Sequence, residues 1–119
     1  MRLETWTKAA PLIEKALKHQ NSHSLDDIKD AILEDYAQLW NGINSVIVTE
    51  IINYPHKKEC RIWLAAGDKH ELTKEMLPEV EKWAKIQNCT TVSVVGRKGW
   101  MRVLKDYKQP HIIIEKELS

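Results

Sequence analysis

The sequence predicts an α/β fold in which helices cover one mixed sheet of antiparallel and parallel strands. Two stretches near the start repeat apolar residues every three or four positions, as amphipathic helices do. Three runs in the middle are rich in β-branched residues and separated by turn signals, which is typical of an antiparallel meander. The second half then follows a strand, helix, strand, helix, strand order. With 119 residues, 43% of them apolar, the chain is expected to be one domain over residues 1–119.

The two N-terminal helices are separated by the break NSHS. The first is expected over residues 4–19, where Pro11 should kink the helix or move its start. Ser24 has the position of an N-cap for the second helix. Asp26 and Asp27 follow in its first turn, where carboxylates interact favourably with the helix dipole.

Three strands are expected next, over AQLW, SVIVTEIINY and ECRIWLAA. Asn41-Gly42 separates the first two and suits a turn with positive φ angles, and PHKK separates the second from the third. The third strand is apolar on both faces, so we expect it to be central in the sheet.

The second half begins with a long helix predicted over residues 69–87. Its apolar face keeps its phase across Pro78, which predicts one kinked helix with the proline on the solvent side. Asn88 is expected to end it in a left-handed conformation. A right-handed crossover then leads to the parallel strand TTVSVV. A short helix over residues 98–107 and a last strand, HIIIEKEL, complete the order.

Composition narrows the classes of function. No stretch is long and apolar enough for a membrane span, and the first residues lack the apolar core of a secretory signal. Cys60 and Cys89 stand in apolar runs and are expected to be buried thiols, which favours a cytoplasmic protein. The net charge of +1 argues against a dedicated nucleic-acid binder. The five histidines show no metal-binding spacing, and no nucleophile motif such as G-x-S-x-G is present.

From about Glu59 to Leu118, the order of elements and the stretch EKWAKIQNCTTVSVVGRKGWMRVLKDYKQPHIIIEKEL resemble the GNAT acyltransferase superfamily. The chain is also similar to small GNAT-like proteins encoded by tailed bacteriophages, some of which are internal virion proteins. The resemblance implies a GNAT fold, with acetyl-CoA as the cofactor if the protein is active. It also implies a location in the host-cell cytoplasm or the virion.

Two departures from the family pattern concern the chemistry. Active members carry an Arg/Gln-x-x-Gly-x-Gly/Ala signature whose amides hold the acyl-CoA diphosphate at a helix N-terminus. The corresponding stretch here is AAGDKHELTKEM, so the cofactor-binding backbone would be that of Ala66, Gly67, Asp68 and Lys69. It has one glycine, followed by an anion where a diphosphate should lie.

The second departure is at the family's general acid, a tyrosine in the short helix. By its spacing, that position is Leu104 here, and Tyr107 follows three residues later. In an active enzyme, Tyr107 or a bound water would act as the acid, and Glu50, in the middle of the second strand, would activate the amine. Asp68, His70 and Glu71 are further candidate bases.

The loop GRKGW and the short helix after it form a candidate partner-binding surface. Arg97 and Lys98 could pair with phosphate or carboxylate, and Lys98, Arg102 and Lys105 form a basic stripe. The alternative is that the glycines make a tight turn, Trp100 anchors the helix in the core, and the cations are solvated.

The resemblance and the two departures from it imply a GNAT-like protein of bacteriophage type with a degenerate acyl-CoA site. It would act by binding a protein partner (a phage protein, a host protein or itself) in a virion or in assembly. The alternatives are an active acetyl-CoA-dependent N-acetyltransferase and, as a third class, nucleic-acid binding through the basic stripe.

Overall fold

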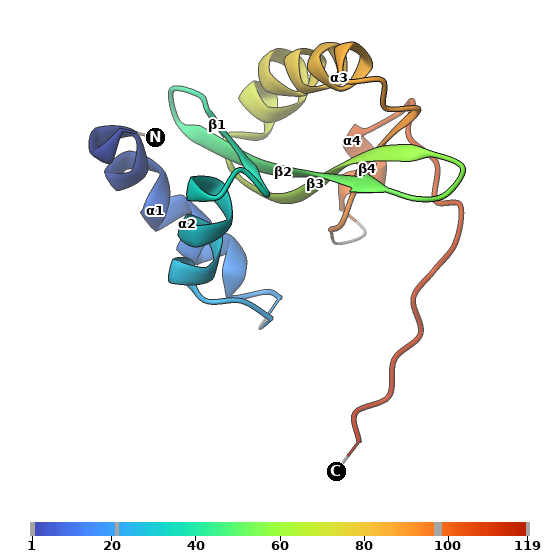
Figure 1. Ribbon diagram of the computed structural model, residues 1–119, viewed down its shortest axis with the longest axis horizontal. Coiled ribbons are helices and arrows are strands. Elements are labelled where there is room, and N and C mark those ends of the chain that lie inside the picture. Colours follow the sequence, from blue (N-terminus) through green and yellow to red (C-terminus); the bar gives the residue numbers. More distant parts are fainter. Residues whose placement is uncertain (1, 21, 97–98, 119) are drawn as a thin grey trace.

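The computed structural model describes residues 2–20, 22–96 and 99–118. Its centre is a four-stranded sheet in the order β1-β2-β3-β4 (Figure 1). The strands are β1 (Gln38–Asn41), β2 (Ser45–Asn53), β3 (Lys58–Gly67) and β4 (Thr91–Val94). The first three pair antiparallel, and β4 pairs parallel with β3. The predicted meander, the internal position of the third strand and the parallel crossover are therefore confirmed.

Helices α1 (Leu3–Leu17) and α2 (Leu25–Leu33) cover one face of the sheet. Pro11 lies inside α1 without ending it. Ser24 caps α2 in a reciprocal capping box, because its hydroxyl accepts the Asp27 amide and the Asp27 carboxylate accepts the Ser24 amide. The predicted N-cap is thus confirmed, and the two helices are joined to the sheet through a shared apolar core.

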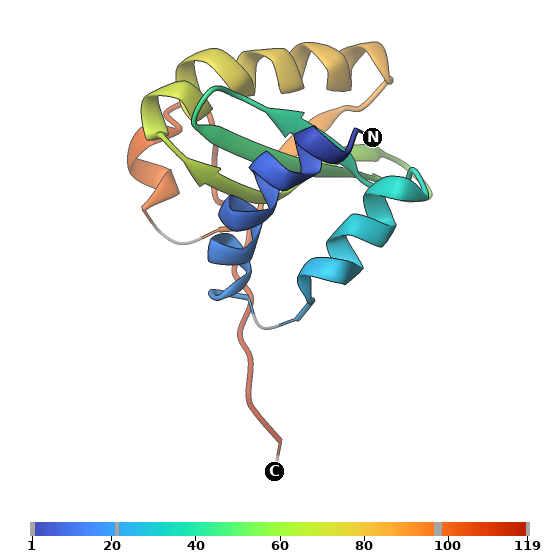
Figure 2. The same cartoon turned by 90° about the vertical axis from the view of Figure 1, so that its left-hand side faces the viewer.

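The other face is covered by a continuous helical run made of η1 (Glu71–Met76), which has π-helical geometry, and α3 (Leu77–Ile86). Figure 2 shows this run on one side of the sheet and α1 and α2 on the other. Pro78 lies inside this run, next to the change from π-helical to α-helical geometry, and it is exposed as predicted. Asn88 ends the run with a φ of 65°, which confirms the predicted left-handed residue.

Strand β2 contributes side chains to both layers. Val46 and Val48 pack with α1 and α2, whereas Ile47 packs with the residues under α3. The run from Ser45 to Thr49 is buried, which explains why its three central residues, Val46 to Val48, are all apolar rather than alternating.

Two expectations at the end of the chain are wrong. The short helix predicted over residues 98–107 is only α4 (Trp100–Val103), because Leu104 leaves helical geometry at φ −101° and ψ 77° as its side chain enters the core. The predicted last strand, HIIIEKEL, is extended chain without strand pairing. A strand requires a partner for its backbone groups, and here the segment runs away from the sheet (Figures 1 and 2).

The turn after β1 also differs in detail from the expectation. Among the described residues, positive φ angles occur at Asp35, Asn88 and Gly67, and Gly42 has none. In the part of the chain that the structure describes, no helix is long and apolar enough to cross a membrane.

Candidate functional site

The carboxyl end of β3 is the place where the sequence predicts cofactor-binding backbone. Ala66 is half-buried, whereas Gly67, Asp68 and Lys69 are exposed. Gly67 has a φ of 124°, and a Cβ added there would lie 2.4 Å from the Asn44 carbonyl oxygen and 2.5 Å from the Ser45 Cα. Glycine is therefore required at this position because the β1–β2 turn packs directly on the backbone.

Asp68 caps the helical run that follows. Its carboxylate Oδ1 accepts the Glu71 amide at 3.0 Å, and its carbonyl accepts the Leu72 amide at 2.9 Å. The Asp68 amide itself donates to the Ser45 hydroxyl at 2.9 Å. Two of the backbone donors with which this helix N-terminus could bind an anion, the Asp68 and Glu71 amides, are thus already bonded within the chain.

Glu71 adds a second carboxylate beside this N-terminus. Its oxygens accept the Ile43 amide at 2.6 Å and the Asn44 amide at 2.9 Å, so it ties the helical run to the β1–β2 turn. Gly42 allows this contact, because a Cβ there would lie 2.7 Å from the Glu71 carboxyl carbon. Hydrogen bonds with Ser45 and with the Asn44 amide hold the pKa of Glu71 below its ordinary value.

This geometry gives a pH prediction for Glu71→Gln. A carboxyl whose pKa is lower in the folded chain stabilises the fold above its unfolded pKa, near 4.5, and that contribution is lost as the pH falls through the folded pKa. The variant should therefore unfold more easily than the wild type at about pH 7, and the difference should shrink at about pH 3. Urea unfolding at both pH values measures this. Glu75→Gln, an exposed carboxylate on the same helical run, is the matched control. A difference independent of pH would contradict the assignment.

The crevice between the parallel strands β3 and β4 is filled from the side of α4. The cavity that remains has a volume of about 10 Å³, the room of about one water molecule. Trp100 lies across Gly96, where an added Cβ would be 2.5 Å from the indole Cδ1. The walls of this cavity are apolar and include Ile62, Ala65, Leu72, Val94, Trp100 and Leu104.

The residues predicted to act as base and acid lie on opposite faces of the sheet. Glu50 is aligned with Arg61 across β2 and β3, and its carboxylate lies 3.7 Å from the Arg61 guanidinium. Tyr107 packs with the core under α3, and its hydroxyl donates to Glu81 Oε2 at 2.6 Å. Burial and this bond to Glu81 raise the pKa of Tyr107. The structure therefore does not bring the two together.

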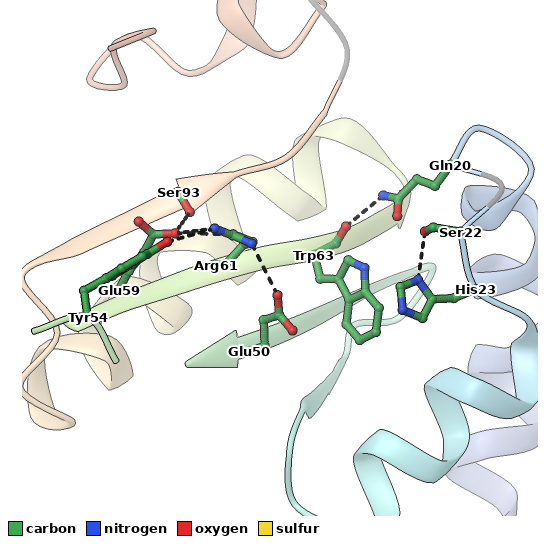
Figure 3. A network of polar contacts seen from close by, with 9 residues as sticks. All are labelled: Gln20, Ser22, His23, Glu50, Tyr54, Glu59, Arg61, Trp63 and Ser93. Atoms are coloured by element: carbon green, nitrogen blue, oxygen red, sulfur yellow. Dashed lines mark hydrogen bonds and ion pairs between the residues drawn. The ribbon is translucent and has the colours of Figure 1, made fainter. Parts of the chain in front are cut away.

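A polar cluster covers the open face of the sheet beyond α1 and α2 (Figure 3). At its centre, Glu59 is buried and accepts from the Ser93 hydroxyl at 2.9 Å and from the Arg61 guanidinium at 3.3 Å. Arg61 also donates to the Tyr54 hydroxyl at 3.2 Å. An amine approaching Glu50 would meet this guanidinium, which repels a cationic acceptor.

The same face ends at the loop between α1 and α2. Trp63 occupies a β-bulge, because Val48 pairs with Leu64 while the next residue, Thr49, pairs with Ile62. The bulge places the Trp63 ring edge-to-face with His23, with ring centroids 4.8 Å apart. Gln20 donates to the Trp63 carbonyl at 3.0 Å, so the loop is fixed to the sheet (Figure 3).

Sequence reasoning missed this cluster, although one signal was present. Glu59, Arg61 and Trp63 alternate along an otherwise apolar strand, a spacing that places them on one face. The partners of Arg61 depend on the register of β2 and β3 and could not be read from the sequence.

Of the proposed partner-binding cations, Arg102 in α4 and Lys105 just after it are exposed. Arg97 and Lys98 lie outside the described residues. His70 is exposed at the start of the helical run.

Both cysteines pack in the core under α3. Cys60 and Cys89 are free thiols, and burial raises the pKa of Cys60 to about 12, so this thiol is un-ionised at neutral pH. Over residues 2–20, 22–96 and 99–118, no three His, Cys, Asp or Glu side chains are grouped so that they could hold a metal ion.

Comparison with solved structures identifies the fold. A probable acetyltransferase superposes with a TM-score of 0.77 at 10% identity, covering 100% of this chain and 96% of that one. A predicted acetyltransferase from Clostridium acetobutylicum, crystallised with acetyl-CoA, gives 0.69 at 13% identity, covering 100% and 92%. A GNAT family acetyltransferase from Staphylococcus aureus gives 0.64 at 15% identity, covering 97% and 90%. No protein-family model and no curated protein matches the sequence. The chain therefore has the fold of the GNAT acetyltransferases, as its order of elements predicts.

Proposed function

We propose that this chain is a GNAT-fold protein that does not transfer acyl groups and acts by binding a protein partner. The observation that carries the proposal is the carboxylate cap on the helix N-terminus after β3. The Asp68 carboxylate takes the Glu71 amide, in the place where the family holds the diphosphate of acyl-CoA. Binding a diphosphate there would require breaking this cap. The negative charges of the ligand would also lie next to the Asp68 and Glu71 carboxylates, which would repel them.

The closed crevice supports the same proposal. Ligands of open α/β sheets bind beyond the carboxyl ends of the strands, where neighbouring connections diverge. Here that space is lined by Trp100 and Leu104 and holds about 10 Å³, far below the several hundred Å³ of a typical ligand pocket. The bacteriophage source, the virion role and the contact surface around Arg97, Lys98, Arg102 and Lys105 remain predictions within this proposal.

Calorimetric titration of acetyl-CoA and CoA into the purified chain tests the proposal. We expect no saturable heat at ligand concentrations up to about 1 mM. Inorganic pyrophosphate, titrated in parallel, separates a specific site from general attraction of polyanions. Micromolar binding of acetyl-CoA would contradict the proposal and favour the alternative, an active N-acetyltransferase, to which the neighbour crystallised with acetyl-CoA gives some support.

A further inference from the structure

The outward face of α2 is acidic and has no cation that balances it. Asp26, Asp30 and Glu34 follow one another at intervals of four residues, so they form one stripe on the side of the helix opposite the buried Ile28 and Ile32. Like charges at this spacing repel each other and destabilise a helix. In the described part of the chain, no ion pair joins these carboxylates to a lysine, arginine or histidine. A cationic surface brought up from outside would therefore relieve this repulsion.

The lysine of α2 is turned away from this stripe, and apolar side chains lie beside it. Lys29 is half-buried over the Trp6 ring of α1, with its ammonium nitrogen 5.8 Å from the ring centroid. Leu33 is 55% exposed and Tyr36 is 72% exposed. Apolar groups bordered by charges are the usual composition of a protein interface. The exposed residues of both kinds form the α2 surface: Asp26, Asp30, Leu33, Glu34 and Tyr36.

The short helix α4 carries charges of the opposite sign. Arg102 and Lys105 are exposed, and neither forms an ion pair with a carboxylate of the described residues, the neighbouring Asp106 included. Next to them, Met101 and Val103 are 45% and 38% exposed. The two apolar side chains and the two cations form the α4 surface. It resembles the α2 surface in having apolar groups beside charges, and it differs from the α2 surface in the sign of those charges.

The two surfaces lie on different layers of the molecule. Helix α2 packs into the core that it shares with α1, whereas α4 packs into the core under α3. Both views show the two helices apart from each other (Figures 1 and 2). The α2 and α4 surfaces therefore do not meet within one chain, but those of two copies can. The formal net charge of only +1 does not oppose such an approach.

We propose that copies of this chain associate head to tail, with the α4 surface of one copy docked on the α2 surface of the next. A second copy fits the acidic stripe because it supplies complementary cations beside apolar groups. The two surfaces differ, so the contact is heterologous and builds rings or open chains. This inference rests on the proposed binding function, since it names the partner that the predicted contact residues Arg102 and Lys105 would bind.

Sedimentation velocity of the full chain over a range of concentrations measures the association. At about 0.05 M salt, we expect the weight-average mass to rise above the 13.9 kDa of one chain as the concentration increases. At about 0.5 M salt it should fall back, because salt screens exposed charges. A single chain at every concentration up to about 1 mM would overturn the inference and leave the α4 surface to another protein or a nucleic acid. Association that does not respond to salt would overturn it too.

Charge reversal identifies the surfaces that meet. One double variant is Asp30→Lys with Glu34→Lys, and the other is Arg102→Glu with Lys105→Glu. Each should raise the dissociation constant by at least about 10-fold, because like charges then face each other across the contact. Association should return when the two variants are mixed in equal amounts, since each contact between them again joins opposite charges. Loss of association in only one of the variants, or no recovery on mixing, contradicts the inference.

Two controls reverse charges on the helical run over the other face of the sheet. Each keeps the number and the spacing of the charges that it matches, and all the replaced side chains are exposed: Lys82→Glu with Lys85→Glu, and Glu75→Lys with Glu79→Lys. Both controls should associate as the wild type does. The far-ultraviolet circular dichroism should be the same for all the variants, which shows that lost association is not lost folding.

The titration of acetyl-CoA is carried out on the same samples, so the two proposals fail separately. A chain that associates and also binds acetyl-CoA contradicts the proposed function and leaves the head-to-tail contact intact. A chain that does neither contradicts only the head-to-tail contact.

Discussion

Replacing Gly67 with alanine should destabilise the fold by at least about 3 kcal/mol. Two costs combine, because the φ of 124° is unfavourable for any residue with a Cβ, and the new atom would lie 2.4 Å from the Asn44 carbonyl oxygen. The atoms that it meets are mostly backbone and can move only if the β1–β2 turn moves. Urea unfolding followed by tryptophan fluorescence measures the loss.

The chain supplies a matched control for this change. Gly99 has a φ of −56°, and a Cβ built there meets nothing within 4 Å. Gly99→Ala should therefore change the free energy of unfolding by less than about 1 kcal/mol. If Gly67→Ala were equally mild, the close packing of the turn on Gly67 would be wrong, and the glycine would be free for a ligand.

Leu104→Ala should cost about 2 to 4 kcal/mol of unfolding free energy, because the side chain is 7% exposed and closes the crevice between β3 and β4. Thermal and urea unfolding measure the loss. Val103→Ala is the control, since Val103 is 38% exposed and should lose less than about 1 kcal/mol.

The same variant reports on the crevice. Truncating Leu104 enlarges an apolar cavity that lies against Trp100. A small apolar probe such as benzene should therefore raise the melting temperature of the variant and leave that of the wild type nearly unchanged. No loss of stability in Leu104→Ala would show that the crevice is not closed by this residue.

Local signals predicted those parts of the fold in which sequence neighbours decide the conformation. The capping box at Ser24 and the left-handed Asn88 follow from side-chain chemistry within one turn of the chain. The parallel pairing of β4 follows from the strand, helix, strand order.

The wrong predictions concern segments whose conformation depends on contacts with residues far away in the sequence. The pattern of residues 98–107 fits a helix, but burial of Leu104 ends it after one turn. The isoleucines at residues 112–114 favour an extended chain, but β-propensity alone does not show whether a strand pairs with them.

In the candidate site, too, the residue types could be read from the sequence, whereas the contacts between distant residues could not. The resemblance to the GNAT family, together with the residue types at Gly67 and Asp68, predicted a degenerate diphosphate site, and this stays a prediction. The sequence could not show that the Asp68 carboxylate caps the helical run, or that Glu50 and Tyr107 lie on opposite faces of the sheet. The bulge at Trp63, where the ring contacts His23, depends on a register shift between β2 and β3. The hydrophobic periodicity of the sequence does not reveal such a shift.

The burial of β2 on both faces has a consequence for how the molecule unfolds. The layer formed by α1 and α2 and the layer under α3 share this strand, with Val46 and Val48 on one side and Ile47 on the other. Neither layer can lose its packing without exposing the strand on which the other depends. The chain should therefore behave as a single cooperative unit, in which damage to one side lowers the melting temperature of both.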